Sequence, residues 1–429
     1  ESFIKDNFDF VDNLKLRWSD GKTGQRQGQA YQYLLGYTSG SSWVFDDGGQ
    51  ILSYGNTSVA ETLLSWADVR MMNFGVDWEI NRGIFGGSVD IFKRAISGIA
   101  ATSTNTVPDF YGLSLPQQNL NKSENVGIDL VLTHRHNIGE FNYRVNATVT
   151  YARSRTTYRE ADKTAQYTSA QNYWSNYTTG RWNGARDYSR YEWAGGQFTG
   201  WEDINSSPVL YDIGNSMNNM LPGMYKLEDR NGNGLIDGQD VYYRWGEGNA
   251  PLQFGLMLSG NYKSFDFSAN FAGASMVSKS VSLSGAMGFG FFSAYYKNYL
   301  DRWTPVEAGA DPFDPQTEWK SGFWPAVAVA TSAYDGNSNS TYRVNQPYNA
   351  VDGTYLRLKS LEVGYTLPRN LTQKIGIRSA RVFLSGTNLL TFCNKLLKPY
   401  DPERNENAWL GAGGYPLMRT YSLGVNLSF

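Results

Sequence analysis

YPLMRTYSLGVNLSF, residues 415–429, decides the fold of this chain. Every second residue, counted back from the C-terminus, is apolar or aromatic: Phe429, Leu427, Val425, Leu423 and Tyr421. The residues between them are small or polar: Ser428, Asn426, Gly424, Ser422 and Thr420. Because the side chains of a β-strand alternate between its two faces, one face of this segment is apolar and the other is polar. The stretch is therefore predicted to be an amphipathic β-strand.

Two kinds of β protein contain such a strand. In a transmembrane β-barrel, the apolar face contacts lipid and the polar face lines the lumen. A strand of a soluble β domain alternates in the same way, but it seldom ends the chain on its aromatic residue. The pattern favours a membrane barrel, and a soluble β domain is the alternative.

The composition is compatible with one large barrel or with two or three ordinary domains, since the chain has 429 residues. Aromatic residues make up 15% of it and include 29 Tyr. Tyr and Trp form the girdles of membrane barrels and also stack on sugars, so this excess does not separate transport from sugar binding. The formal net charge of -2, without a basic stripe, argues against nucleic acid as a partner. The sequence has no apolar run long enough for a membrane-spanning helix.

The strand pattern repeats along the chain. Strand-like segments occur at 8–20, 30–38, 66–96, 125–154, 251–275, 354–368, 381–392 and 415–429, about a dozen strands in all. Three of these segments, 66–96, 125–154 and 251–275, each contain two strands joined by a short turn and are predicted to be β-hairpins. Residues 39–62, rich in Gly, Ser and Asp, are predicted to be a loop.

Two long segments, 155–222 and 276–350, break the alternation. The first is dense in Trp, Tyr, Asn and Arg and has no regular strand pattern. Segments of this length are seldom passive connectors, so both are predicted to be functional loops. Short turns on one side of the strands and long loops on the other are typical of outer-membrane barrels, whose long loops are extracellular.

Several stretches together carry a family signature: LKLRWSDGKTGQ (14–25), NLNKSENVGIDLVL (119–132), DRNGNGLIDGQD (229–240), APLQFGLMLSGNYKSFDFSANFAG (250–273), TYLRLKSLEVGYTLP (354–368), RVFLSGTNLLTF (381–392), YDPE (400–403) and YPLMRTYSLGVNLSF (415–429). They resemble the SusC-like branch of the TonB-dependent transporters, the nutrient importers of glycan-utilising Gram-negative bacteria. The matching stretches cover nearly the whole chain in the order of the family.

The resemblance implies an all-β fold, the C-terminal part of an antiparallel transmembrane β-barrel of about 22 strands with a plug domain inside it. Residues 1–429 are expected to form this barrel portion. No segment here resembles a plug domain or a TonB box, so both are expected upstream, as is any signal peptide.

For function, the resemblance implies an outer-membrane importer of a Gram-negative bacterium that takes up oligosaccharides or, alternatively, peptides. Its expected partners are a SusD-like surface lipoprotein acting as a lid, the TonB complex reached through the missing N-terminal part, and outer-membrane lipid. The terminal Phe429 resembles the signal that the outer-membrane assembly machinery recognises.

The sharpest chemical motif is DRNGNGLIDGQD, residues 229–240. With Asp229 as position 1, oxygen-bearing side chains fall at the positions of a twelve-residue calcium loop, with Gly at position 6. The candidate Ca²⁺ ligands are Asp229, Asn231, Asn233, the carbonyl of Leu235, Asp237 (directly or through water) and Asp240. Position 12 is Asp rather than the bidentate Glu, and two Asn lower the charge. A structural cation is predicted, and an Asn-Gly turn between strands is the alternative.

Aromatic residues of the first long loop are candidates for contact with a substrate or a partner. They are Trp174, Tyr177, Trp182, Tyr188, Trp193 and Trp201. Such side chains stack on sugar rings or enclose peptide side chains, and they equally pack a loop onto its own protein.

No set of residues indicates an enzyme. His134 and His136 lie two residues apart near a turn without an acidic or Cys cluster, and surface histidines are expected there. Neither a G-x-S-x-G motif nor a Walker A motif is present. Cys393, the single cysteine, has no partner for an internal disulfide. A barrel enzyme and a secreted carbohydrate-binding β protein are the rival classes, and the second would be soluble without detergent.

Overall fold

A computed structural model describes most of the chain. The described residues are 8–28, 31, 34, 37–45, 49–56, 63–104, 115–164, 177–183, 189–211, 220–237, 240–243, 250–279, 297–324, 326, 344–345, 351–399, 401–403 and 417–429. The chain divides into two compact units. The first comprises Glu1–Arg135 and Asn146–Asn183, and the second comprises His136–Val145 and Gly184–Phe429.

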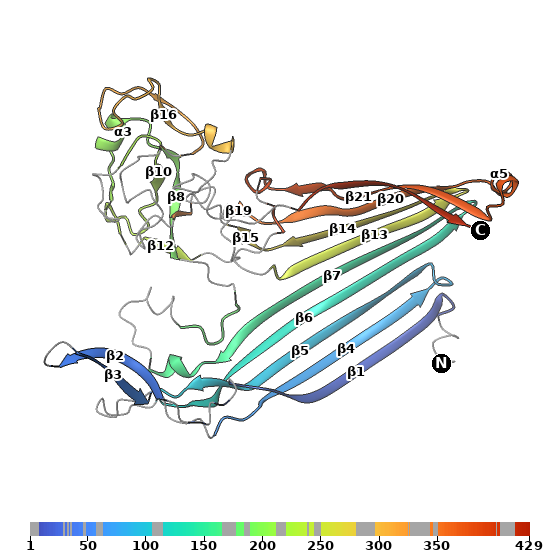
Figure 1. Ribbon diagram of the computed structural model, residues 1–429, viewed down its shortest axis with the longest axis horizontal. Helices are drawn as coiled ribbons and strands as arrows, with labels where there is room; N and C mark the ends of the chain where they lie inside the picture. Colours follow the sequence, from blue (N-terminus) through green and yellow to red (C-terminus); the bar gives the residue numbers. More distant parts are fainter. Residues whose placement is uncertain are drawn as a thin grey trace. The chain divides into compact units, whose positions relative to one another are not determined.

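The main element is a ten-stranded sheet with the strand order β1-β4-β5-β6-β7-β13-β14-β20-β21-β22 (Figure 1). Its first strands are β1 (Val11–Gln25), β4 (Ala67–Ile80), β5 (Phe85–Thr102), β6 (Gln117–Ile138) and β7 (Phe141–Tyr158). Its later strands are β13 (Leu252–Tyr262), β14 (Phe265–Ser275), β20 (Tyr355–Thr366), β21 (Ser379–Cys393) and β22 (Thr420–Ser428). The prediction of an all-β, antiparallel architecture is confirmed, and the three predicted hairpins are β4–β5, β6–β7 and β13–β14.

Short and long connections alternate along the sheet. Short turns join β4 to β5, β6 to β7, and β13 to β14. Long segments join β1 to β4, β5 to β6, β14 to β20, and β21 to β22. In the β4–β5 turn, Asn81, Arg82 and Gly83 all have positive φ, which Asn and Gly adopt at low energetic cost. The expected asymmetry of short turns and long loops is therefore present in the strand order.

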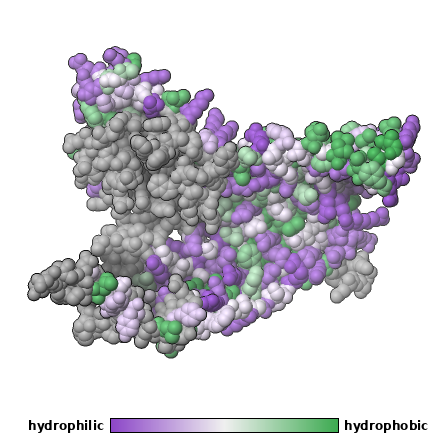
Figure 2. Space-filling view, viewed as in Figure 1, coloured by the Kyte–Doolittle hydropathy of each residue, from purple (hydrophilic) through white to green (hydrophobic). Residues whose placement is uncertain are grey.

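The apolar residues of the terminal strand share a face with those of its neighbour. Leu384 of β21 lies opposite Leu423 of β22, and Val382 lies opposite Val425. These side chains are exposed: Leu384 is 64% and Leu423 is 72% accessible. Figure 2 shows hydrophobic side chains gathered over the end of the sheet that contains β20, β21 and β22. The pattern that the C-terminal sequence predicts is thus an exposed apolar sheet face.

The opposite face of the sheet is polar and is linked by arginines. In the first unit, Arg17 of β1 donates to Asp77 of β4 at 2.7 Å and to Asp90 of β5 at 2.8 Å. In the second unit, Arg381 of β21 donates to Glu362 of β20 at 2.7 Å and also pairs with Asp266 of β14. Each arginine therefore joins two carboxylates on two other strands. Such bidentate, charge-assisted bonds fix the register of a polar face as well as adding stability.

Two sequence predictions about loops are wrong. Residues 39–62 are not only a loop, because β2 (Tyr37–Phe45) and β3 (Gly49–Asn56) form an antiparallel hairpin within this region. Likewise, the stretch 155–222 is not devoid of regular structure. It contains β8 (Ser189–Gln197), the one-turn helix α3 (Trp201–Asn205) and β9 (Leu210–Tyr211). The partners of β8 and β9 come from later segments of the chain, so the local sequence carries no alternation that would reveal them.

The remaining elements are short. They are η2 (Glu160–Lys163), β10 (Tyr225–Leu227), β11 (Leu235–Ile236), β12 (Val241–Tyr243), β15 (Ser278–Lys279), η4 (Lys297–Leu300), β16 (Thr304–Pro305), β17 (Trp319–Lys320), β18 (Val344–Asn345), β19 (Val351–Asp352), α5 (Arg369–Thr372), η5 (Gln373–Ile375) and η6 (Lys395–Leu397). Among the residues that the structure describes, no helix has the length and apolar character needed to cross a membrane.

Candidate functional site

Parts of both predicted long loops pack together in the second unit. We call this body the loop subdomain and define it as residues 189–211, 220–237, 240–243, 297–324 and 326. Its small sheet is centred on β8, which pairs antiparallel with β10 and β12 and parallel with β18. The loop subdomain is therefore assembled from segments far apart in the sequence.

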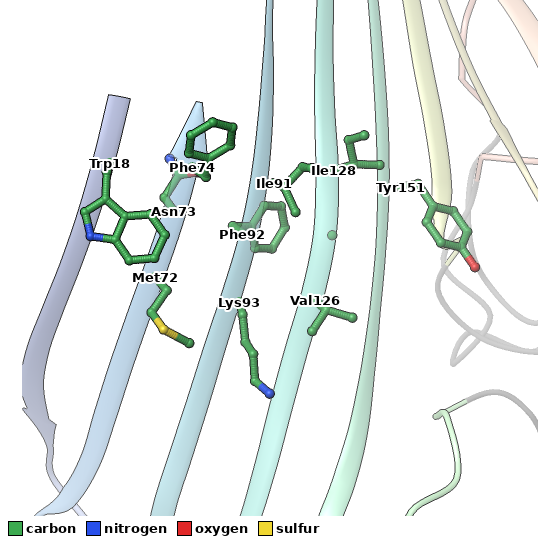
Figure 3. Close-up of a pocket in the computed structure, with 11 residues that line it drawn as sticks. Trp18, Met72, Asn73, Phe74, Ile91, Phe92, Lys93, Val126, Ile128 and Tyr151 are labelled. Carbon is green, nitrogen blue, oxygen red and sulfur yellow. The ribbon is translucent and has the colours of Figure 1, made fainter. Parts of the chain in front are cut away.

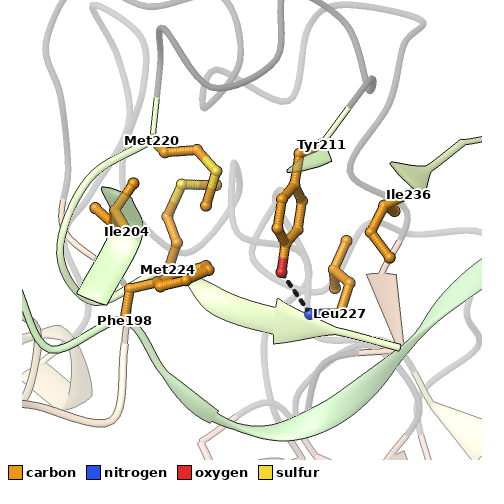
Figure 4. Packing of buried hydrophobic residues seen from close by; sticks show 7 residues of the cluster. All are labelled: Phe198, Ile204, Tyr211, Met220, Met224, Leu227 and Ile236. Carbon is orange, nitrogen blue, oxygen red and sulfur yellow. Dashed lines mark hydrogen bonds between the residues drawn. The ribbon is translucent and has the colours of Figure 1, made fainter. Parts of the chain in front are cut away.

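An apolar core holds the loop subdomain together (Figure 4). Met220 and Ile236 are fully buried and Phe198 is 1% exposed, and these side chains pack with Ile204, Tyr211, Met224 and Leu227. The phenol oxygen of Tyr211 accepts the backbone N–H of Leu227 at 3.0 Å, so its polar group is satisfied inside the core. Burying one such large apolar side chain stabilises a fold by about 1.5–3 kcal/mol.

Gln197 joins the two loop regions through its side-chain amide. Its Nε2 donates to the carbonyls of Gly223 at 2.9 Å and Phe323 at 3.2 Å, and its Oε1 accepts Trp303 Nε1 at 3.2 Å. Gly223 has φ of +91°, and a Cβ there would lie 2.4 Å from Trp303 Cγ. Only glycine fits this close approach of backbone and indole.

The predicted calcium loop lies between β10 and β12, within the loop subdomain. Asp229 accepts the N–H groups of Gly232 at 2.8 Å and Gly234 at 2.7 Å. Asp240 is fully buried, and its carboxylate accepts N–H groups from Arg230 and Asp237, both at 2.9 Å. Backbone donors therefore fix the carboxylates at the first and last positions of the loop.

The two asparagines of the loop are fixed in the same way. Asn231 Oδ1 accepts the N–H of Asn233 at 2.9 Å, and Asn233 Oδ1 accepts the N–H of Leu235 at 2.8 Å. Ile236, at position 8, belongs to the apolar core, and Leu235 and Ile236 pair in parallel with β9. The loop is thus anchored on the core beneath it.

The donor set of the loop fits a hard cation, because it consists of oxygen atoms only. Among the described residues, no group of three or more His, Cys, Asp and Glu side chains could hold a metal ion by itself. A cation here would consequently depend on Asn and carbonyl oxygens together with Asp229 and Asp240.

Asp203 is a titratable residue of α3 in the loop subdomain. It accepts Lys226 Nζ at 2.7 Å and the N–H of Thr199 at 2.9 Å. Burial acts to raise the pKa of this carboxyl, but the bonds from Lys226 and Thr199 outweigh burial and hold the pKa below its ordinary value. In the core, burial raises the pKa of Tyr211 and of Tyr225. These tyrosines therefore remain protonated hydrogen-bonding groups near neutral pH.

The aromatic residues predicted to contact a ligand do not all lie in one unit. Trp182 belongs to the first unit, where the guanidinium carbons of Arg153 and Arg155 lie 5.1 Å and 4.6 Å from its ring centroid. Trp201 belongs to the second unit, where it packs against the apolar core of the loop subdomain and against a second apolar cluster formed by Leu221, Trp303 and Ala326. Both indoles thus pack on their own chain.

The structure describes less of the other aromatic candidates. Tyr177 is described and half-buried, and only the backbone of Trp193 is described, as part of β8 opposite Leu227. Trp174 and Tyr188 lie outside the described residues. The contact role of these residues remains a prediction.

Phe429 follows β22 at the end of the chain and is 85% exposed. Of the two histidines, His134 lies beside Phe85, with ring centroids 4.3 Å apart. The two rings are tilted by 32° to each other, and the residues lie opposite each other in the β5–β6 strand pairing.

An ion cluster that the sequence does not predict joins β20 to the segment before β22. Arg357 is 2% exposed and donates to Asp401 at 2.5 Å and to Glu403 at 2.7 Å. Lys359 also pairs with Glu403. The two cations lie in the stretch YLRLK and the two carboxylates lie in the stretch YDPE, and both stretches belong to the family signature. The presence of both stretches in one sequence was therefore the only sequence signal for this contact.

A hollow of about 510 Å³ lies on the first unit, on strands β1, β4, β5, β6 and β7 (Figure 3). Its lining includes Trp18, Phe74, Ile91, Val126 and Tyr151. None of these residues belongs to the two predicted long loops.

Known proteins similar to this chain are named as TonB-dependent receptors. TonB-dependent receptor P3 of Formosa agariphila is 25% identical over 100% of this chain and 40% of its own length. TonB-dependent receptor SusC of Bacteroides thetaiotaomicron is 24% identical over 100% of this chain and 39% of its own length. The chain is a relative of the SusC-like TonB-dependent transporters. Its resemblance to them, predicted from the sequence, is confirmed, although no protein-family model matches the chain.

Solved structures share the fold. The RagAB peptide transporter matches 99% of this chain and 42% of its own chain, with a TM-score of 0.61 and 20% identity. Its open-open state matches with a TM-score of 0.63. The chain thus spans about two fifths of the length of its relatives. These relatives are named receptors and transporters rather than enzymes, as the sequence predicted.

Proposed function

We propose that this chain is the C-terminal barrel portion of an outer-membrane importer that works with a SusD-like surface lipoprotein and TonB. The observation that carries the proposal is the similarity of the whole chain to SusC and related TonB-dependent receptors. The ten-stranded amphipathic sheet supports it, because an exposed apolar face is suited to lipid and a charged face is suited to a wet lumen.

In this proposal the loop subdomain lies on the extracellular side, where it meets the ligand and the lipoprotein. A barrel tolerates elaborate structure in its long loops, which is where binding residues are commonly placed. In the importer, movement of a plug domain, driven through TonB, opens the path. Phe429 serves as the assembly signal at the end of the last strand.

An oligosaccharide is the proposed substrate class, since a relative is SusC and the chain is rich in Tyr and Trp. A peptide is the second candidate, favoured by the shared fold with the RagAB peptide transporter. Both classes need a large, aromatic and hydrogen-bonding binding surface, so residue chemistry alone does not separate them.

We further propose that residues 229–240 bind a structural Ca²⁺. The oxygen-only donor set and the fixed carboxylates of Asp229 and Asp240 support this site. When bound, the cation would supply charge compensation and cross-link the loop. The residues themselves anchor the loop on the apolar core through Ile236.

Uptake by intact cells tests the proposed function. Cells that lack the full-length transporter are compared with cells in which it is restored, using labelled oligosaccharides and labelled peptides separately. We expect restored uptake of one class, abolished by a protonophore because TonB draws on the inner-membrane proton gradient. Unchanged uptake of both classes on deletion would contradict the proposal.

A further inference from the structure

Two Asn-Gly pairs follow each other in residues 229–240: Asn231-Gly232 and Asn233-Gly234. Asn231, Gly232 and Asn233 are exposed, and the two glycines have positive φ, of +72° and +80°. Glycine has no side chain to hinder its backbone nitrogen, so the side-chain amide of an asparagine before glycine is especially open to attack by that nitrogen. Sequence and exposure together make both pairs chemically labile.

The reaction to which such a pair is prone is deamidation. The backbone nitrogen of the glycine attacks Cγ of the preceding asparagine and gives up its proton, and the side-chain nitrogen leaves as ammonia. Solvent water then opens the five-membered succinimide ring at either of its two carbonyl carbons, which gives aspartate or isoaspartate. No oxidant or reductant takes part. The rate therefore depends on how free the glycine nitrogen is to attack.

Both glycine nitrogens are held by the carboxylate of Asp229. Its Oδ1 accepts the N–H of Gly232 at 2.8 Å, and its Oδ2 accepts the N–H of Gly234 at 2.7 Å. These bonds are charge-assisted and so are stronger than bonds between neutral groups. The carboxylate also disfavours loss of the amide proton, because the nitrogen would then carry a second negative charge beside it. One side chain thus opposes the attack at both pairs.

The asparagine side chains that would be attacked are held as well. The Oδ1 atoms of Asn231 and Asn233 each accept a backbone N–H two residues further along the chain, at 2.9 Å and 2.8 Å. These bonds fix the position of Cγ in each asparagine. Closure of the succinimide ring must therefore break a hydrogen bond on both sides of the reacting atoms.

We propose that Asn231 and Asn233 are deamidation sites and that Asp229 is the residue that keeps both of them from reacting. Conversion to aspartate adds ligand charge at positions 3 and 5 of the loop, and ligand charge is one of the properties that set the Ca²⁺ affinity of such loops. Conversion to isoaspartate has the opposite effect, because it lengthens the main chain by one atom and displaces the backbone groups that the loop bonds. The protection arises from the hydrogen bonds of the loop itself and holds with or without the cation proposed above.

Incubation of the purified full-length transporter at mildly alkaline pH tests the proposal. Peptide mass spectrometry follows the conversion of amide to carboxyl at each asparagine over time. We expect Asn231 and Asn233 to react roughly tenfold faster or more in Asp229→Ala than in the wild type, since a hydrogen bond to a charged acceptor no longer has to break first. Asn183, which precedes Gly184 in the sequence, lies outside the loop and is the internal reference, with an equal rate in both proteins.

Asp240→Ala is the matched control. Asp240 belongs to the same loop and is a candidate ligand of the same cation, but its carboxylate accepts the N–H groups of Arg230 and Asp237. Its removal loosens the loop and leaves the bonds of Asp229 to the glycines, so the two asparagines should react far more slowly than in Asp229→Ala. Asp229→Asn keeps one accepting oxygen and should give a total rate between those of the wild type and Asp229→Ala. If Asp229→Ala unfolds the apolar core, the comparison of Asp229→Asn with the wild type carries the test.

Two outcomes in the variants overturn the proposal. Equal rates in the wild type and the Asp229 variants would remove the role of this carboxylate. Equal acceleration in Asp240→Ala would show that any loosening of the loop is sufficient.

A chelator separates this proposal from the calcium site. Protection that the wild type keeps in chelator supports the role of Asp229, whereas protection lost on chelation assigns it to a bound cation and overturns that role. Metal content and uptake are measured on the same proteins. The calcium site and the importer function are therefore judged independently of the deamidation rates.

Discussion

The sheet and the loop subdomain place their apolar side chains in opposite ways. On the sheet, Leu384 and Leu423 are 64% and 72% exposed, whereas Met220 and Ile236 of the loop subdomain are fully buried. The loop subdomain is therefore built as proteins are in water, with its apolar side chains inside. The sheet carries an apolar face too extensive to be left in water, so it requires a different solvent on that side. One chain thus follows two sets of packing rules.

Substitution of Arg357 is expected to lower the free energy of unfolding most, because Arg357 joins a sheet strand to the segment that contains Asp401 and Glu403. Arg357→Ala leaves the buried Asp401 without its cation, which costs about 3–5 kcal/mol when a buried pair loses one partner. Thermal unfolding of the full-length transporter in detergent would measure the loss. Lys359→Ala is the control, since Lys359 pairs with Glu403, which is more exposed than Asp401, and its loss should cost less than about 1 kcal/mol. Equal effects of the two variants would refute a dominant role of the buried pair.

Ile236→Ala should destabilise the loop subdomain without destabilising the sheet. Removing this fully buried side chain is expected to destabilise the loop subdomain by about 2–5 kcal/mol. Leu210 lies on the paired strand β9, opposite Leu235, and is 56% exposed, so Leu210→Ala should cost far less. Hydrogen exchange is the measurement: protection should fall in residues 189–243 and persist in β20 to β22. A uniform loss across both regions would show that they unfold as one.

Calcium should act on the loop subdomain alone. Bound Ca²⁺ at about 100 times its dissociation constant would stabilise the folded state by about 2.7 kcal/mol. Asp229→Asn keeps one of the two oxygens that accept the N–H groups of Gly232 and Gly234 and removes one negative charge, so it should lower the metal content and reduce this gain. Metal analysis of the purified transporter, with and without a chelator, is the check. Wild-type protein without bound metal at millimolar Ca²⁺ would rule the site out.

The smallest expected effect is the loss of local stability around Asp203 at low pH. The pKa of Asp203 is lower in the folded protein than its ordinary value of about 3.9. A lowered folded pKa means that the stabilisation is complete above the unfolded-state pKa and is lost as the pH falls through the folded value. Hydrogen exchange of α3 should therefore quicken below about pH 4 in the wild type, and Asp203→Asn should reduce this pH dependence. An identical acid response in the variant would exclude Asp203 as its source.

The sheet and the loop subdomain also differ in how much of their structure could be predicted from the sequence. β22, β13 and β14 follow the period of two because one face of each strand is apolar, and this pattern is local. β8 could not be found in this way, since its pairing with β10, β12 and β18 depends on residues from other segments. The hydrogen bond between Gln197 and Trp303 joins residues more than a hundred positions apart, so no pattern in the local sequence predicts it either.

The same difference between local and long-range contacts holds for the candidate functional site. The predicted calcium loop is contiguous, so its spacing was readable from the sequence, and in the structure backbone N–H groups hold the carboxylates of Asp229 and Asp240. The cation itself remains a prediction. The contact of Arg357 with Asp401 is not contiguous, and only the joint presence of two family stretches hinted at it. Trp182 and Trp201 were readable as aromatic residues, but their packing against Arg155 and the apolar clusters was not.

Site-directed spin labelling of adjacent residues on β22 tests the central claim, that the apolar face of the sheet contacts lipid. Leu423→Cys and Ser422→Cys are compared in the full-length transporter with Cys393→Ser, reconstituted in bilayers. These positions lie on opposite faces of one strand. The account predicts that the label at 423 collides with oxygen, which concentrates in the bilayer, and that the label at 422 collides with a water-soluble nickel reagent. Greater access of the nickel reagent to position 423 than to position 422 would contradict it.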